Sequence, residues 1–369
     1  MSGGFASAFA EGEGLAAKCL AGLGDTSGAT LGIVYVSEPA AAGLPALVRE
    51  VAAGTGIADW VGGVGLGICA AGHEVYDRPA ASVLTVAVPE DSFRIFGATD
   101  DPGNDLPRDH ARWIEKAQPA LALIHADPRC PDLTRAAIDA GTATGAFLVG
   151  GLVSHQCEAP LVAGTTLGGG GISGLMLSPE VAVATALSQG CSPVGPVRRI
   201  DEAQDNIVMK IDGRPALEVF LEDIGPELAQ NLRRLGGTIF AGLPVAGSDT
   251  GDYLVRNLMG IDPRQGWIAL AAEVTPGDPI MFTRRDPESA KKDLVRMLKQ
   301  LGGRLSGKPR AGVYVSCIAR GMSLFGEPAV ETDLIRETLG DFPLVGFFAN
   351  GEISRDRLYG YTGVLTLFT

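Results

Sequence analysis

Apolar residues along the chain fall into strand-length runs separated by helical stretches, and this arrangement occurs three times. Each copy has a buried strand, a helix, a second strand that carries Val-Gly, and a third strand. The first copy comprises LGIVYVSE from Leu31, LPALVREVAAGTG from Leu44, WVGGVGLGIC from Trp60 and ASVLTVAVP from Ala81. The second extends from LALIHADP at Leu121 to GISGLMLSP at Gly171, and the third from AGVYVSCIARG at Ala311 to YTGVLTLFT at Tyr361. The pattern predicts a repeat of large supersecondary units.

The segment between the second and third copies has a different pattern. NIVMKIDGRPALEVFLED, from Asn206, alternates around Asp212-Gly213, which predicts a two-residue hairpin. A helix is expected at residues 226–235, followed by strands and by an amphipathic helix in ESAKKDLVRMLKQLGG. The stretch CSPVGPVRRIDEAQD, residues 191–205, is rich in proline and charge. We therefore expect two domains, residues 1–195 and 196–369.

Short connections between fully apolar runs favour mixed or antiparallel sheets over one doubly wound parallel sheet. The expected fold class is α/β in the broad sense (α+β). Each half is predicted to hold a mixed or antiparallel sheet with flanking helices, arranged as an α/β/β/α layered sandwich with internal repeats.

Composition narrows the choice of partners and compartment. The net charge is −13 and there is no stripe of lysine and arginine, which argues against nucleic acid or an anionic membrane as partner. The six cysteines are scattered, which is typical of a reduced, cytoplasmic protein. The first 20 residues read as an amphipathic helix without the basic start of a signal peptide. We expect a soluble, intracellular protein.

Familiar catalytic and cofactor motifs are missing from the sequence. It lacks the phosphate-binding G-x-x-x-x-G-K-[ST], the zinc motif H-E-x-x-H and the nucleophile motif G-x-S-x-G. The histidines at 73, 110, 125 and 155 stand apart, so no metal and no cofactor are predicted. TTLGGGGISG, from Thr165, fits a tight hairpin loop or a ligand-binding loop, and both interpretations remain open.

The third copy carries the clearest candidate chemistry. SCIARG places Cys317 at the end of a strand, three residues before Arg320 and close to Gly321. Arg320 could lower the pKa of the Cys317 thiol or bind a ligand carboxylate. Cys317 could equally be a buried structural cysteine, with Arg320 in a salt bridge.

A carboxylate follows an Asn-Gly turn in PLVGFFANGEISRDRLYGYTGVLTLFT. Asn350 and Gly351 are typical of a plain hairpin turn, which would leave Glu352 exposed. The apolar runs on both sides instead favour a carboxylate at the rim of a core. A carboxylate there needs a cation, a bound ammonium group or Arg320 as partner.

These motifs together resemble the FIST family, named for F-box and intracellular signal transduction proteins. The resemblance rests on C-x-x-R-G, matched by Cys317, Arg320 and Gly321, and on G-F-F-x-x-G-E, which includes Phe347 and Glu352. MKIDGRPALEVFLED resembles the hairpin that opens the C-terminal FIST domain, and LGIVYVSE, VGGVGLGI and LVGGLVSH resemble the N-terminal domain. Ala319 stands where the family often has glycine, so the loop is expected to be less open.

The resemblance implies a stand-alone bacterial sensory protein that binds a small ligand, such as an amino acid or related metabolite. The expected ligand-binding residues are Cys317, Arg320, Gly321, Phe347, Asn350, Gly351 and Glu352. An unidentified signalling protein would carry the output, because no catalytic signalling segment is left over. Two alternatives remain open: a protein-interaction scaffold, and a cysteine-dependent enzyme that uses Cys317 as nucleophile.

Overall fold

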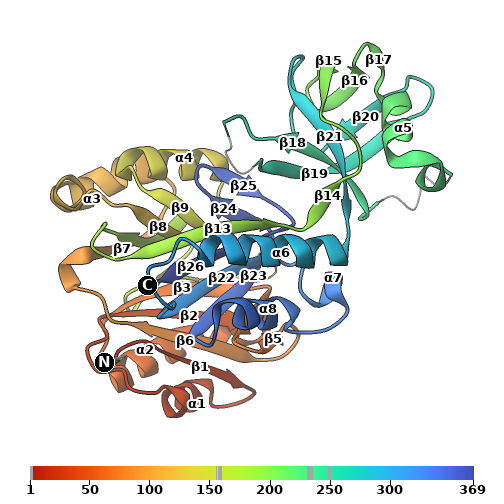
Figure 1. Cartoon of the computed structure of the whole chain (residues 1–369). Coiled ribbons are helices and arrows are strands. Elements are labelled where there is room, and N and C mark those ends of the chain that lie inside the picture. The colour runs from red at the N-terminus through yellow and green to blue at the C-terminus, as the bar shows by residue number, and fades with distance from the viewer. Residues whose placement is uncertain (1–2, 155, 157–159, 231–235, 248–250) are drawn as a thin grey trace. The chain divides into compact units, whose positions relative to one another are not determined.

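The computed structural model describes residues 3–154, 156, 160–230, 236–247 and 251–369 (Figure 1). Two compact units are present: unit 1 comprises Met1–Ser188 and Leu294–Thr369, and unit 2 comprises Gln189–Asp293. All three sequence copies therefore lie in unit 1. His155, Cys157 and the predicted helix end at Leu235 lie outside the described residues. The predicted domain boundary between residues 195 and 196 divides the sequence into two successive segments. The compact units are a different kind of division, because residues 294–369 belong to unit 1, so this boundary stays a prediction.

Unit 1 contains three mixed, six-stranded sheets, one built around each sequence copy. The strands of the first sheet, in spatial order, are β1 (Ala6–Glu11), β6 (Ala80–Val86), β2 (Leu31–Ser37), β3 (Asp59–Gly65), β10 (Leu161–Ala163) and β11 (Thr166–Gly168). Those of the second are β25 (Arg357–Tyr359), β24 (Glu352–Ser354), β9 (Phe147–Leu152), β8 (Leu121–Ala126), β12 (Ile172–Leu177) and β7 (Phe93–Thr99). Those of the third are β13 (Val183–Gln189), β26 (Thr362–Phe368), β22 (Ala311–Cys317), β23 (Leu344–Ala349), β4 (Gly67–Ala70) and β5 (His73–Val75). The prediction of mixed sheets with flanking helices and internal repeats is confirmed, although three sheets, not two, share the core.

The two strands that flank the first helix of each copy pair in parallel: β2 with β3, β8 with β9, and β22 with β23. The hairpin that follows each second strand then joins a different sheet. The hairpin β4–β5 pairs with β23, β10–β11 pairs with β3, and β24–β25 pairs with β9. Each copy thus completes the sheet of another copy, in a closed cycle.

The glycine of each Val-Gly pair allows the second strand to pack against the first. A Cβ at Gly62, Gly150 or Gly346 would overlap the carbonyl oxygen of the residue beside it on the parallel strand, which is Val34, Ile124 or Tyr314. Gly62 and Gly150 also have φ of 144° and 141°, a conformation that residues with a side chain rarely adopt. The recurring Val-Gly is therefore a requirement of the backbone geometry.

Helices cover the outer face of each sheet, and the inner faces share one apolar core. The helices are α1 (Leu15–Gly22) and α2 (Leu44–Thr55) on the first sheet, α3 (Pro102–Ala117) and α4 (Leu133–Thr144) on the second, and α6 (Pro287–Gly302) and α8 (Val330–Leu339) on the third. Short helical segments are η1 (Glu38–Gly43), η2 (Glu90–Ser92) and α7 (Met322–Phe325). The shared core includes Ile33, Leu123 and Val313, one from the first strand of each copy. Along β2, the core residues Leu31, Ile33 and Tyr35 stand at every second position, because successive side chains of a strand point to opposite faces.

The described residues of unit 2 form an antiparallel sheet and the helix α5, and the unit also includes the start of α6. The strands are β14 (Cys191–Pro193), β15 (Arg198–Gln204), β16 (Ile207–Ile211), β17 (Arg214–Pro215), β18 (Ile239–Pro244), β19 (Tyr253–Asp262), β20 (Trp267–Leu270) and β21 (Pro279–Arg285), and the helix is α5 (Ala216–Ala229). Pairing of β18 with β21 closes six of the strands into a ring. The predicted hairpin at Asp212-Gly213 is confirmed, because Ile211 pairs with Arg214 and both turn residues have positive φ.

The N-terminal prediction of one amphipathic helix is wrong in its first part. Residues Ala6–Glu11 form β1, and only Leu15–Gly22 form a helix. In β1 the buried residues Ala6, Ala8 and Ala10 alternate with half-buried ones, and the strand pairs with β6, some 75 residues later. That long-range pairing overrides the helical preference of alanine. Within the described part of the chain, no helix combines the length and apolar character needed to cross a membrane.

Candidate functional site

Three aromatic rings meet in the core of unit 1 at the same level of the three sheets. Tyr35, His125 and Phe347 are contributed by β2, β8 and β23. Ring centroids are 4.8 Å apart for Tyr35 and Phe347, 5.5 Å for Tyr35 and His125, and 6.0 Å for His125 and Phe347. Gly63 and Gly151 stand beside Tyr35 and His125 on the neighbouring parallel strands, so each large ring lies next to a residue without a side chain. Each sequence copy therefore contributes one ring to this level of the core.

His125 is neutral in this environment. It is fully buried, and burial lowers the pKa of its imidazole to about 3. Its Nε2 lies 2.9 Å from the Tyr35 hydroxyl, whereas its Nδ1 has no hydrogen-bond partner among the described residues. A neutral imidazole has one donor and one acceptor nitrogen, so one hydrogen-bonding function of His125 is left unsatisfied.

Unsatisfied polar atoms in unit 1 concentrate at this level. Among the described residues of the unit, the buried side-chain atoms without a partner are Ser82 Oγ, His125 Nδ1, Ser173 Oγ and Glu352 Oε1. The strand register places all four at one level, since Ser82 pairs with Tyr35, Ser173 with His125, and Glu352 with Gly151. We call these four residues, together with Tyr35, the polar layer. Buried polar groups normally have partners, so their accumulation here makes the polar layer a candidate functional site.

Glu352 is completely buried, which contradicts the interpretation of a plain turn with an exposed carboxylate. Its Oε2 accepts hydrogen bonds from the Thr362 backbone N–H at 3.1 Å and the Thr362 hydroxyl at 2.7 Å. Burial raises the pKa of the Glu352 carboxyl to about 8, although the Thr362 hydrogen bonds and the positive charge of Arg320 act in the opposite direction. Glu352 is therefore mostly protonated at neutral pH.

The turn before Glu352 carries the chain from one sheet to another. β23 ends at Ala349 in the third sheet, and β24 begins at Glu352 and pairs with β9 in the second. Asn350 is exposed, whereas Gly351 is buried with φ of 144°, and a Cβ there would lie 2.9 Å from Leu358 Cδ1. Asn350 and Gly351 thus form a sheet-to-sheet crossing and not a hairpin turn.

Cys317 lies at the end of β22 and is 5% exposed. Burial raises the pKa of its thiol well above the usual range, and the neighbouring carboxyl of Glu352 adds to this effect. Arg320 acts in the opposite direction but does not reverse the shift. A raised pKa disfavours the thiolate, which is the nucleophilic form.

The Arg320 guanidinium is fully buried and paired with Glu331 of α8. Its Nε and Nη2 lie 2.7 Å and 2.6 Å from Glu331 Oε1, and the hydroxyls of Tyr314 and Ser316 also donate to this carboxylate. The Nη1 atom has a weaker contact, 3.5 Å from the Tyr361 carbonyl oxygen. Most of the charge of Arg320 is therefore compensated within the protein.

Gly321 is required by close packing against a hairpin from the first copy. It has φ of 54°, and a Cβ there would overlap Tyr76 and Glu74. The Glu74 carboxylate accepts hydrogen bonds from the backbone N–H of Met322 at 2.7 Å and of Ala329 at 2.8 Å, at the starts of α7 and α8. Gly321 thus lets Glu74 cap both helices.

The structure brings together part of the predicted site. Cys317, Arg320 and Glu352 lie close enough to influence one another electrostatically, and Phe347 lies in the ring cluster. Asn350 is at the surface. Sequence reasoning missed Tyr35, Ser82, Ser173, Glu331 and Thr362, and it considered His125 only as a base for Cys317. A signal for the pairing of Tyr35 with His125 was present, because each is the fifth residue of the first strand of its copy.

Comparison with known proteins covers nearly the whole chain. Residues 30–214 match the model of the FIST N domain, and residues 216–355 match that of the FIST C domain. An uncharacterized protein of Mycobacterium tuberculosis strain H37Rv is 29% identical over 337 residues, which is 87% of this chain and 86% of the relative. An uncharacterized protein of Mycobacterium bovis is 28% identical over 323 residues, or 84% of this chain and 82% of the relative.

Proposed function

Since the chain belongs to the FIST family, whose domains are associated with signal transduction and regarded as small-ligand sensors, we propose that it binds an amino acid or a related metabolite that carries an ammonium group. The observation that carries this proposal is the unpartnered Oε1 of the buried Glu352. A carboxylate oxygen without a donor is a suitable acceptor for an ammonium group.

The surroundings of Glu352 support a zwitterionic ligand. Thr362 holds the other carboxyl oxygen, so the orientation of Oε1 is fixed. Arg320 lies nearby, and within the described residues its Nη1 has a single long contact, 3.5 Å to the Tyr361 carbonyl oxygen, so this nitrogen can donate to a ligand carboxylate. The proposed ligand-binding residues are Glu352 and Arg320 as polar anchors, with Cys317, Gly321, Phe347, Asn350 and Gly351 shaping their surroundings.

Binding of an ammonium group should be coupled to release of a proton. The pKa of Glu352 is about 8 in the unliganded protein, so the carboxyl must ionise when it pairs with a cation at pH 7. Affinity should therefore increase as pH rises from 6 to 8. In this proposal a separate signalling protein in the cytoplasm recognises the liganded state.

The test is calorimetric titration with a panel of amino acids, in buffers of different ionisation enthalpy. We expect Glu352→Gln to weaken binding by about 1.5–3 kcal/mol, the contribution of a hydrogen bond to a charged group, and to abolish proton release. Glu337→Gln, a substitution at an exposed residue of α8, is the matched control and should leave binding unchanged. Equal affinities for the wild type and the Glu352→Gln variant would exclude Glu352 as a ligand anchor.

A further inference from the structure

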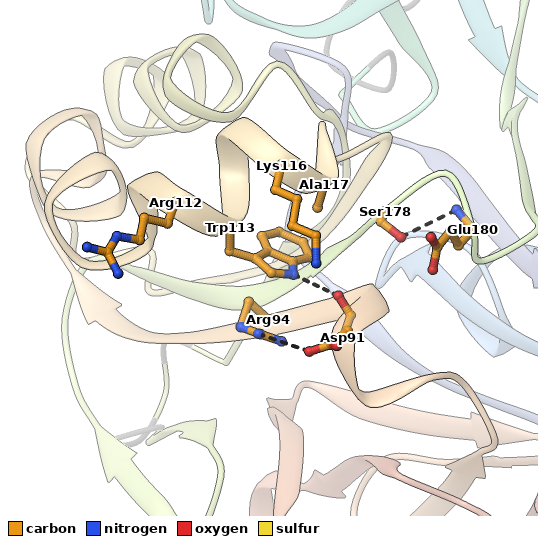
Figure 2. A pocket seen from close by; sticks show the side chains of 8 residues that line it. All are labelled: Asp91, Arg94, Arg112, Trp113, Lys116, Ala117, Ser178 and Glu180. Atoms are coloured by element: carbon orange, nitrogen blue, oxygen red, sulfur yellow. Dashed lines mark hydrogen bonds and ion pairs between the residues drawn. The ribbon is translucent and has the colours of Figure 1, made fainter.

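A hollow of about 290 Å³ opens beside the second half of α3 (Figure 2). It is lined by Trp113, by the basic residues Arg94, Arg112 and Lys116, and by the acidic residues Asp91 and Glu180, among others. None of these residues belongs to the polar layer or to the proposed ligand-binding residues around Glu352. The hollow is therefore a separate candidate for ligand recognition.

Arg94, which lines the hollow, is held in position by several contacts. Its guanidinium carbon lies 5.5 Å from the centre of the Trp113 ring, and its Nη1 donates to the carbonyl oxygens of Phe93 at 2.6 Å and Glu90 at 3.1 Å. The Trp113 indole N–H in turn donates to the Asp91 carbonyl oxygen at 2.8 Å. These contacts fix both the arginine and the ring before any ligand binds, which lowers the entropic cost of binding.

Arg112 and Lys116 add two cations that the protein does not neutralise. They lie one helical turn apart in α3 and are exposed, and within the described residues neither forms an ion pair. Two like charges at this spacing destabilise a helix slightly. In Figure 2 the Lys116 side chain runs beside the Trp113 ring, whereas the Arg112 guanidinium points away from Trp113 and Arg94.

The hollow has an excess of positive charge although the chain as a whole carries −13. Among the lining residues three cations face two carboxylates, and the carboxyl of Asp59, outside the lining, interacts electrostatically with Arg94. Asp91 is 3.7 Å from Arg94 but its side chain is 86% exposed, so water screens this pair strongly. Glu180 lies apart from Arg94 and Lys116 in Figure 2, beside Ser178. A dianionic group would compensate the cations better than either carboxylate does.

We propose that this hollow binds the phosphate group of a small phosphorylated molecule. Arginine and lysine are the side chains that proteins use most for phosphate, arginine through its planar fork and lysine as a point charge. Arg94 is the preorganised donor, Lys116 and Arg112 supply further charge, and the edge of Trp113 contacts the organic part of the ligand. The volume accommodates a ligand of small-metabolite size.

The test is calorimetric titration of the full chain, at low salt and at physiological salt, with inorganic phosphate, inorganic sulfate and ribose 5-phosphate. We expect ribose 5-phosphate to bind more tightly than inorganic phosphate, and both more tightly than sulfate, with weaker binding at the higher salt. Arg112→Gln combined with Lys116→Gln should reduce the affinity for ribose 5-phosphate at least tenfold. Arg94→Gln should do the same.

The matched control removes two charges from another helix. Lys292 and Lys299 are exposed residues of α6, and Lys292→Gln combined with Lys299→Gln should change the affinity less than twofold. Equal loss in both double variants, equal affinity for the three anions, or no binding at low salt would overturn the proposal. Glu352→Gln should not change phosphate binding, so failure here and failure of the amino-acid proposal are distinguishable.

Discussion

Tyr35 and His125 lie 90 residues apart in the chain, yet the Tyr35 hydroxyl and His125 Nε2 are 2.9 Å apart in the core of unit 1. They occupy equivalent positions in the first and second sequence copies. The third copy has Val315 at this position and supplies its ring from the next strand, as Phe347. The three copies therefore differ in chemistry where they meet, although their first and second strands pair in the same way.

Tyr35→Phe tests this hydrogen bond. Removal of the hydroxyl leaves a second nitrogen of the buried His125 without a partner, so we expect a loss of about 1–3 kcal/mol in the free energy of unfolding. Denaturant titration gives this value. Tyr35→Phe combined with His125→Leu removes both partners and should cost less than the sum of the two single substitutions; strict additivity would show that the two groups do not interact.

The Val-Gly glycines should tolerate no side chain. Gly62→Ala and Gly150→Ala each place a Cβ against a carbonyl oxygen and force an unfavourable φ, so we expect losses above about 3 kcal/mol or failure to fold. Gly97→Ala is the control, because a Cβ there meets nothing within 4 Å. Thermal unfolding compares the three proteins. A small effect at Gly62 would mean that the two parallel strands can separate locally at little cost.

The stability of the protein should depend on both residues of the buried ion pair Arg320–Glu331. Arg320→Met leaves the Glu331 carboxylate buried without its cation, and we expect a loss of about 3–5 kcal/mol. Glu331→Gln combined with Arg320→Met removes the second charge as well and should recover part of that loss. Unfolding titrations of the single and double variants measure the recovery, and its absence would mean that the surrounding hydroxyls, not the charge, determine the cost.

Two buried groups predict opposite dependences of stability on pH. The pKa of Glu352 is raised to about 8 in the folded protein. Its contribution to the free energy of unfolding is therefore fully present below the pKa of an unfolded glutamate and is lost as pH rises toward 8. The pKa of His125 is lowered to about 3, so its contribution is present above the pKa of an unfolded histidine and is lost as pH falls toward 3. Melting temperatures between pH 3 and pH 9 test both statements. Glu352→Gln should flatten the alkaline side alone, and His125→Asn the acid side alone.

Cys317 should react slowly with a small electrophile in the native, unliganded protein. Its thiol is buried and its raised pKa keeps it protonated. Peptide mapping after brief alkylation at pH 8 should show less label on Cys317 in the native protein than after denaturation in urea. Fast labelling in the native state would show that the end of β22 opens to solvent and would favour Cys317 as a nucleophile.

Local sequence patterns predicted the features that depend on neighbouring residues. The three strand-helix-strand copies and the Asp212-Gly213 hairpin follow from periodicity and turn chemistry, which act over a few residues. The burial of Glu352 agrees with the apolar runs beside it. The motifs of the third copy carried the family resemblance, and the FIST N and FIST C matches confirm it.

Features that depend on distant pairing could not be predicted in this way. Nothing near Gly67 indicates that β4 pairs with β23, since an edge strand of either sheet would have the same apolar pattern. The partner of Arg320 was missed because Glu331 lies on a helix that returns to the strand end only in the folded chain. The polar layer was not predicted as a unit, because its five members come from five strands that are far apart in the sequence.

The cyclic exchange of hairpins has a consequence for synthesis of the chain. β4 and β5 emerge early but have no sheet edge to join until β23 has been made, more than 270 residues later. β9 can pair with β8 at once, but its other edge stays open until β24 has been made. Pairing at such separations closes large loops and is slow, and strand edges left open during that time favour association with other chains. The open strand edges of the first half of the chain are therefore covered only after the last 76 residues have been made. A protein truncated before Leu294 should be insoluble.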